Sequence, residues 1–327
     1  LTKNVSLKPE LLWSGYMLLD EITRAYDLID SSEADGESVV QAWESRNKDV
    51  IAETETVKGE DGSTDFVKLR VPGSKGKISG GDAPTIGVVG RLGGVGARPS
   101  AIGAVSDADG AIVAISLGLK LAKMVSRGDG LPGDVIVSTH VCPISPVQPH
   151  DPVDFMGSPV DMKTMNDLEI DEAMDAILSI DATKGNRIIN ERGFAISPTV
   201  KEGYILRPSE DLLRIMGLVT GQSPVTFPLT TQDITPYGNG LHHINSILQP
   251  ATATNSPVVG VATTSGAVVP GIGTGVNYPL ELEAATRFCL EVAKEFTLES
   301  CDFYSREEYD RLVELYGSME KFQTLGN

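Results

Sequence analysis

Several polar residues stand where apolar, strand-like stretches of the sequence end, and their side chains could act together. Arg91, His140 and Asp181 each end or directly follow such a stretch, and Asp107 and Asp109 lie where a loop meets a helical pattern. Ligands of open parallel sheets bind outside the carboxyl ends of the strands. We therefore expect these five side chains to line one crevice, with Arg91 binding a substrate carboxylate.

The two aspartates allow two interpretations, and the sequence leaves both open. Carboxylates at a helix N-terminus can accept hydrogen bonds from free backbone N–H groups and interact favourably with the helix dipole. The oxygens of Asp107 and Asp109 could instead hold a cation. Cys142, two residues after His140, could be a nucleophile only if a base activated its thiol.

The elements that must position these residues follow from the spacing of apolar residues. Strand, helix and strand alternate around the candidate residues, which is the pattern that builds parallel α/β sheets. The fold class is therefore predicted as a three-layer α/β/α sandwich with a mostly parallel sheet. The expected helices are 8–29, 36–46, 111–124, 171–176, 209–220, 280–296 and 306–325, and the expected strands are 50–57, 66–71, 86–90, 134–141, 176–180, 194–197, 203–206 and 257–264.

We expect two parts in the chain. Residues 1–48 form N-terminal helices that pack on the core, and residues 49–327 form a single α/β sandwich domain with a proline-rich loop at 143–159. The segment 49–71 reads as a hairpin, because glycines separate two strand-like runs. By analogy with other proteins of this class, this hairpin is expected at a sheet edge, where it could support a homo-oligomer.

Composition narrows the classes of partner. The formal net charge of −18 and a sequence pI near 4.6 argue against binding to nucleic acid or to an anionic membrane. The three cysteines form no CxxC pair, so a disulfide scaffold is not expected. No apolar signal core or membrane-spanning run appears, which favours the cytoplasm.

In their order, these residues resemble the superfamily of dinuclear zinc exopeptidases, which are aminopeptidases and carboxypeptidases on a phosphorylase-like α/β sandwich. The resemblance covers about residues 85–296. Ser106-Asp-Ala-Asp-Gly110 looks like the turn with the metal-bridging Asp, which places Asp107 at that position. Ser179-Ile-Asp-Ala-Thr183 is similar to the segment with a later acidic ligand, at Asp181, and Asn277 lies nearest the position of the last histidine.

The sequence departs from that superfamily at two sites. Arg91 replaces the first His-x-Asp, and arginine cannot ligate a metal because its guanidinium stays protonated. His140-Val-Cys142 replaces the paired glutamates, which normally supply the general base. Asp107, His140 and Asp181 could still hold a divalent metal, Zn or Mn, since imidazole and carboxylate groups suit zinc and three ligands leave a position open.

The chain is also similar to an uncharacterised bacterial and archaeal family of about 300 residues. Members of this family lie near genes for D-aminopeptidases and oligopeptide transport. This resemblance implies a context of peptide or amide catabolism.

Three hypotheses of function follow. The first is a metal-dependent hydrolase of an amide or short peptide-like substrate, with Arg91, Asp109, Asp233 and Asn277 as substrate-binding residues and no base assigned. The second is a metal-free binding or assembly protein on the same fold. The third is an enzyme that binds a small anion or nucleotide with the glycine-rich stretches 87–96 and 266–275. The sequence assigns no role to His150, His242 and His243.

Overall fold

A central sheet carries the candidate residues in the computed structural model, which describes residues 17–91, 94–149, 154–184, 189–235, 240–241, 247–267 and 274–323. Nine strands of this part of the chain form the sheet in the order β1-β2-β4-β3-β7-β11-β9-β10, and β8 pairs with β11. The strands are β1 (Ile51–Gly59), β2 (Gly62–Val71), β3 (Ile86–Gly90), β4 (Val135–Val141), β7 (Ala176–Ala182), β8 (Gly193–Ile196), β9 (Val200–Lys201), β10 (Tyr204–Ile205) and β11 (Val258–Thr264).

The four central strands run parallel. β3 pairs with β4 and with β7, and β7 pairs with β11, each in parallel register, whereas the antiparallel pairs lie toward the two edges. Every residue of β3, β4 and β11 is buried, which explains why these strands appear as continuous apolar runs in the sequence. The predicted α/β sandwich with a mostly parallel central sheet is confirmed.

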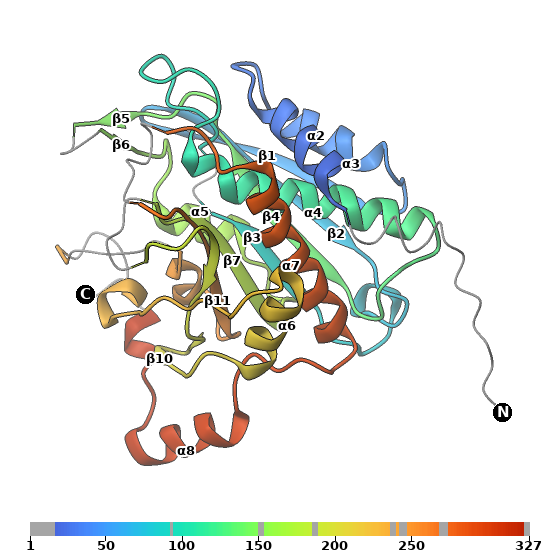
Figure 1. Ribbon diagram of the computed structural model, residues 1–327, viewed down its shortest axis with the longest axis vertical. Coiled ribbons are helices and arrows are strands. Elements are labelled where there is room, and N and C mark those ends of the chain that lie inside the picture. The colour runs from blue at the N-terminus through green and yellow to red at the C-terminus, as the bar shows by residue number, and fades with distance from the viewer. Residues whose placement is uncertain are drawn as a thin grey trace.

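Helices cover the two faces of the sheet unequally (Figure 1). α4 and α7 lie directly on one face, and α2, α3 and α6 pack around them, whereas α5 lies on the opposite face with the short helices η3 and η4. The α-helices are α2 (Leu19–Ile29), α3 (Gly36–Glu44), α4 (Asp109–Ser126), α5 (Met162–Glu169), α6 (Glu210–Thr220), α7 (Pro279–Thr297) and α8 (Arg306–Tyr316). The shorter elements are η1 (Lys77–Ser79), η2 (Ser106–Ala108), η3 (Thr231–Ile234), η4 (Gln249–Thr252), η5 (Glu320–Gln323), β5 (Val147–Gln148) and β6 (Phe155–Met156).

The N-terminal helices contribute to the main hydrophobic core. Ile22 and Trp43 are buried in the same cluster as residues of α4, α7 and the sheet. The Trp43 indole Nε1 donates a hydrogen bond to the backbone oxygen of Ile115, 3.1 Å away. Gly118 makes room for this ring, because a Cβ there would lie 2.4 Å from Nε1 of Trp43. A glycine in the middle of α4 is thus explained by packing.

One predicted helix is wrong, and two others differ from their expected bounds. The helix expected at 8–29 begins at Leu19, and residues 8–16 lie outside the described residues. The helix expected at 306–325 ends at Tyr316 and is followed by η5. The segment 171–176 is a turn and the start of β7, and the helix before β7 is α5, at Met162–Glu169. Two aspartates explain the difference. Asp161 accepts a hydrogen bond from the N–H of Thr164, 2.8 Å, and caps α5, whereas Asp171 accepts from the N–H of Ala173, 3.0 Å, and fixes a turn.

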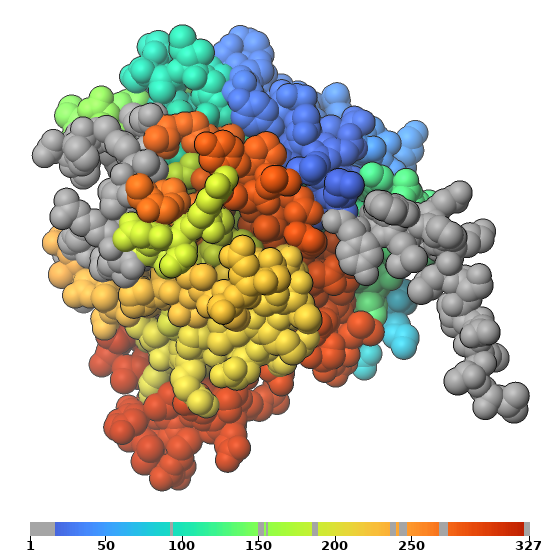
Figure 2. Space-filling model, in the orientation of Figure 1, coloured from blue at the N-terminus to red at the C-terminus, as the bar shows by residue number. Residues whose placement is uncertain are grey.

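α8 projects from the body of the molecule at its lower edge in both Figure 1 and Figure 2. None of its residues is buried. In the described part of the chain, we find no helix with both the length and the apolar character needed to span a bilayer.

Candidate functional site

The strand order predicts where a ligand-binding crevice lies, at the carboxyl ends of β3 and β7. Along the chain, β3 is followed by β4 on one side and then by β7 on the other, so the direction of the strand order reverses between β3 and β7. Ligands of open α/β sheets bind outside the carboxyl ends of the strands at such a point. Arg91 and Asp181 stand at these two carboxyl ends, as the sequence predicts.

Gly110 brings the start of α4 onto these strand ends. A Cβ at Gly110 would lie 2.6 Å from the backbone oxygen of Arg91 and 2.7 Å from that of Ile180. Only glycine therefore lets the first turn of the helix touch β3 and β7 at once. Asp107 and Asp109, on either side of that contact, are held at the crevice.

Asp109 contacts strand β11 and two loops through its carboxylate. It is fully buried, and its Oδ2 accepts a hydrogen bond from the Thr263 hydroxyl, 2.8 Å, at the end of β11. Its Oδ1 accepts from the backbone N–H of Asn277, 2.9 Å. The Nζ of Lys184 lies 3.8 Å from Oδ2 and donates to the backbone oxygen of Gly275, 3.0 Å. The loops after β7 and before α7 are thus tied to the start of α4.

The pKa values of Asp107 and Asp109 are both raised toward neutral pH. Burial raises the pKa of Asp107 to about 6, and the neighbouring negative charge of Asp109 adds to the rise. Burial likewise raises the pKa of Asp109 to about 6, against the opposing charge of Lys184. Asp107 is half-buried, so a ligand can reach it more readily than it can reach Asp109. A carboxyl with a pKa near 6 is suited to proton transfer at neutral pH.

Neither aspartate caps α4. The N-cap residue is Ala108, and no side chain accepts a hydrogen bond there. Asp109 uses its oxygens for Thr263 and Asn277, as described above, and the capping interpretation is therefore wrong for this helix.

The raised pKa of Asp107 predicts how stability depends on pH. Because the folded-state pKa lies above the ordinary 3.8, the folded protein binds this proton more tightly than the unfolded chain does. The stability that this proton contributes is complete below the ordinary pKa and is lost as the pH rises through about 6. Asp107→Asn needs no proton, so we expect it to raise the free energy of unfolding by about 1–2 kcal/mol at neutral pH and to change it little in acid. Urea unfolding across this pH range measures the difference, and equal effects at both ends would contradict it.

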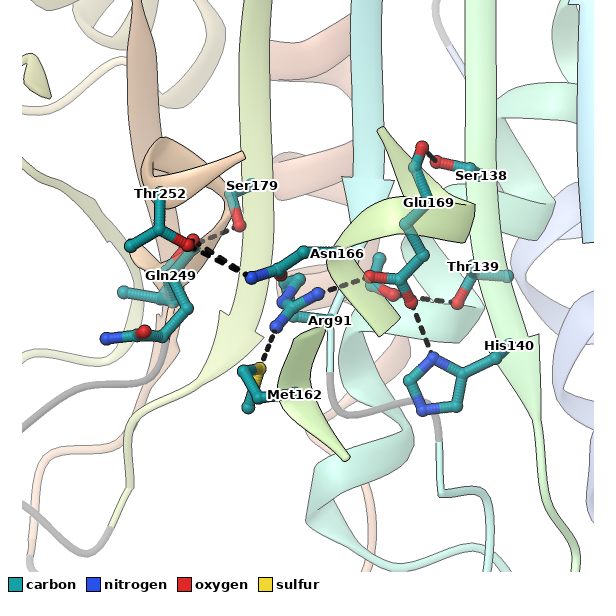
Figure 3. A network of polar contacts seen from close by, with 12 residues as sticks. Arg91, Ser138, Thr139, His140, Met162, Asn166, Glu169, Ser179, Gln249 and Thr252 are labelled. Atoms are coloured by element: carbon teal, nitrogen blue, oxygen red, sulfur yellow. Dashed lines mark hydrogen bonds and ion pairs between the residues drawn. The ribbon is translucent and has the colours of Figure 1, made fainter. Parts of the chain in front are cut away.

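A second group of charged side chains lies on the α5 face of the sheet (Figure 3). Glu169, at the end of α5, stands between Arg91 and His140. Its Oε2 pairs with Nη1 of Arg91, and its Oε1 lies 2.5 Å from Nδ1 of His140. Arg91 and Glu169 are fully buried and His140 nearly so, which makes this a closed ion-pair unit. The second terminal guanidinium nitrogen of Arg91, Nη2, contacts the Met162 sulfur.

Electrostatics and backbone contacts fix this unit in place. Burial alone would raise the pKa of Glu169, but the charges of Arg91 and His140 hold it below its ordinary value. The Ser138 hydroxyl donates to the backbone oxygen of Glu169, 2.7 Å, and so attaches the end of α5 to β4. A carboxylate bound to Nδ1 orients the imidazole ring and leaves Nε2 available to bind or exchange a proton.

The three expected metal ligands do not come together. In the described segments, no three His, Cys, Asp or Glu side chains form a group that could hold a metal ion. The His140 side chain points to Glu169 at the end of α5, whereas Asp107 lies in η2, just before α4, and α4 and α5 cover opposite faces of the sheet. Asp181 is buried, and its Oδ1 accepts from the N–H of Ala182, 2.7 Å. These three residues therefore do not fit a shared zinc or manganese ion.

The four expected substrate-binding residues lie in three different places. Asp109 and Asn277 are in contact at the crevice, and Arg91 is paired with Glu169. Asp233 lies elsewhere, fully buried in η3, where its carboxylate accepts from the N–H and hydroxyl of Thr230, 2.7 and 3.0 Å, in a capping box. His150, His242 and His243 lie outside the described residues.

Cys142 and the first glycine-rich stretch have structural surroundings. Burial raises the pKa of the Cys142 thiol, which disfavours a nucleophilic thiolate. A Cβ at Gly94 would lie 2.6 Å from Met156, and one at Gly96 would lie 2.7 Å from the backbone oxygen of Pro143. These glycines allow close packing of loops. Most of the second stretch, residues 268–273, lies outside the described part of the chain.

Two important residues were not predicted from the sequence. Lys184 follows β7 by two residues, so the rule that ligand-binding residues follow strand ends could have identified it. Glu169 gives no such signal, because its partners are 29 and 78 residues away along the chain.

Comparison with known proteins identifies the family. No curated protein matches the chain. A family model described as a protein of unknown function (DUF1177) matches residues 55–326, which is most of the sequence. The chain therefore belongs to the DUF1177 family.

Proposed function

We propose that the protein is a hydrolase of a small amide or peptide-like compound, which binds in the crevice between the ends of β3 and β7. One observation carries this proposal: Asp107, Asp109 and Lys184 gather where the strand order reverses. Titratable groups with shifted pKa values in a crevice are typical of active sites. The order of residues that resembles the zinc exopeptidases supports the choice of an amide bond.

Asp107 is the proposed proton-transfer group. In its ionised form, it would accept a proton from a water molecule whose oxygen forms a bond to the amide carbon. The same carboxyl would then give that proton to the leaving nitrogen as the C–N bond breaks. Asp109 would hold the loops of the crevice through Thr263 and Asn277, and Lys184 would place a positive charge near the developing oxyanion.

A binding protein without turnover is the second candidate, and the contacts of the crevice favour it in one respect. Asp109 already accepts hydrogen bonds from Thr263 and Asn277, and Lys184 already donates to Gly275. Groups whose hydrogen bonds are satisfied within the protein hold the loops of the crevice in place and are less available for proton transfer or charge stabilisation. The substrate experiment separates the two candidates.

A panel of N-acetyl amino acid amides and dipeptides, in both chiralities, tests the proposed hydrolase. We expect release of free amine from at least one member, with a rate that rises as the pH passes through about 6, because Asp107 must be ionised to act as base. Parallel samples with a chelator and with added zinc or manganese would show whether metal matters. Binding of panel members by calorimetry without any release of amine would support the second candidate and refute the first.

A further inference from the structure

The two edges of the central sheet are built differently. One edge ends in β10, which has two residues and contacts the segment of α8. There the Tyr204 hydroxyl lies within hydrogen-bond distance of the backbone oxygens of Leu312, 3.3 Å, and Gly317, 2.5 Å. The other edge is β1, which has nine residues and pairs only with β2 in the described sheet. Proteins usually protect such edges, because unpaired backbone groups there can bind another strand.

The register of the hairpin shows which backbone groups of β1 face outward. Gly59 pairs with Gly62 across a two-residue turn, so these two residues exchange both backbone hydrogen bonds. Bonding then alternates along the strand, and the odd-numbered residues of β1 bond to β2. The outward N–H and C=O groups belong to Ala52, Thr54, Thr56 and Lys58. None of these groups makes a backbone hydrogen bond outside the β1–β2 ladder in the described part of the chain.

We propose that β1 pairs in antiparallel fashion with β1 of a second copy of this chain, which joins the two sheets into one. A second copy is the partner that this edge fits, because its alternating donors and acceptors are complementary to an identical edge related by a two-fold axis. No new side chain needs to enter an existing core, since α3 covers a face of the β1–β2 hairpin and no strand of the described residues pairs with the outer edge of β1.

The charges on β1 select the register. Outward-bonding residues must pair with each other, which restricts the two-fold axis to a few positions. An axis at Thr54 or Glu55 would place glutamates directly opposite each other, Glu53 facing Glu55 or Glu55 facing itself, and like charges in that position are destabilising. An axis at Thr56 gives the longest pairing without facing glutamates, from Glu53 to Gly59. Thr56 then faces its own copy, and Lys58 faces Thr54.

Substitutions at Thr56 test the pairing directly. Thr56→Pro removes the outward N–H at the two-fold axis without removing a bond to β2, and Thr56→Glu keeps the N–H but brings two negative charges together. Thr56→Val is the matched control, because it retains the N–H and loses, as Thr56→Pro does, the hydroxyl bond to Asp65, 2.7 Å. Sedimentation velocity at micromolar concentrations measures the dimer, and circular dichroism confirms that each variant is folded.

We expect a dimer for the wild-type protein and for Thr56→Val. The dissociation constant should rise by about tenfold or more for Thr56→Pro and Thr56→Glu, as expected for the loss of two hydrogen bonds or the gain of charge repulsion. A wild-type monomer at these concentrations would overturn the proposal. So would a dimer that neither variant weakens, because its interface would then lie on another surface.

Discussion

Replacing Glu169 with alanine is expected to lower the free energy of unfolding by about 3–5 kcal/mol. The change leaves the guanidinium of Arg91 buried without its carboxylate, and Nε of Arg91 already has no hydrogen-bond partner in the described structure. An uncompensated buried charge is among the costliest defects in a protein interior. Urea unfolding followed by circular dichroism at neutral pH measures the loss.

Two comparisons show that the orphaned charge causes this loss. Glu172→Ala, at an exposed position three residues later, should change stability by less than about 0.5 kcal/mol. The double variant Arg91→Met/Glu169→Leu removes both charges and should recover much of the loss, because apolar residues of similar size often replace a buried ion pair without cost. A loss below about 1 kcal/mol in Glu169→Ala would contradict a closed ion-pair unit.

The stability that the Glu169 carboxylate contributes depends on pH with a defined sign, which the isosteric variant Glu169→Gln tests. The pKa of Glu169 in the folded protein lies below its ordinary value of 4.5, so its charged form is favoured by folding. The stability that it contributes is present above that ordinary value and is lost as the pH falls through the folded-state pKa. The difference between the wild-type protein and Glu169→Gln should therefore shrink in acid.

Asp107→Asn is expected to lower kcat/KM for any amide substrate by about 10²- to 10⁴-fold, the usual contribution of a positioned acid or base. The amide side chain cannot accept the proton from water, although its size is nearly that of the carboxyl. The loss should lie in kcat, because the proton moves only in the transition state. Steady-state kinetics on the best substrate of the panel measure it.

Comparing the activity of Asp107→Asn with its stability distinguishes a catalytic role from a structural one. Replacing a residue with a purely structural role would lower both the stability and the activity of the protein. Asp107→Asn should instead be more stable than the wild-type protein at neutral pH and far less active. Asp82→Asn, at an exposed position away from the crevice, is the control and should leave both unchanged. Full activity in Asp107→Asn would refute the proposed role of this residue in proton transfer.

The fold could be predicted from the sequence because buried parallel strands and amphipathic helices leave strong local patterns. β3, β4, β7 and β11 are mostly apolar runs, and the helix expected at 209–220 is α6, which Ser209 caps by accepting from the N–H of Leu212. α5 was misplaced because its N-cap, Asp161, follows a proline-rich segment that hides the start of the helix. Local signals therefore predict elements well where capping and periodicity agree.

The site was predictable only in part, because strand ends indicate a crevice but do not reveal which side chains pair with each other. The contact of Asp109 with Asn277 spans 168 residues of sequence. The sequence predicts His140 and Asp107 as ligands of one metal, yet His140 pairs with Glu169 at the end of α5, and Asp107 lies in η2 beside the start of α4. The face that the His140 side chain takes depends on the register of its strand, which a single sequence leaves open.

Asp30, at the C-terminal end of α2, ties the N-terminal helices to the loop that leads from β3 to the crevice. Its backbone oxygen accepts from Nη2 of Arg98, 2.7 Å, and its Oδ1 accepts from the N–H of Ala104, 2.5 Å. The family match begins only at residue 55, so these bonds cross its boundary. The unit that folds is therefore longer than the unit that sequence comparison detects. Replacing Asp30 should consequently free the N–H of Ala104 and loosen this loop, although residue 30 lies before the matched segment.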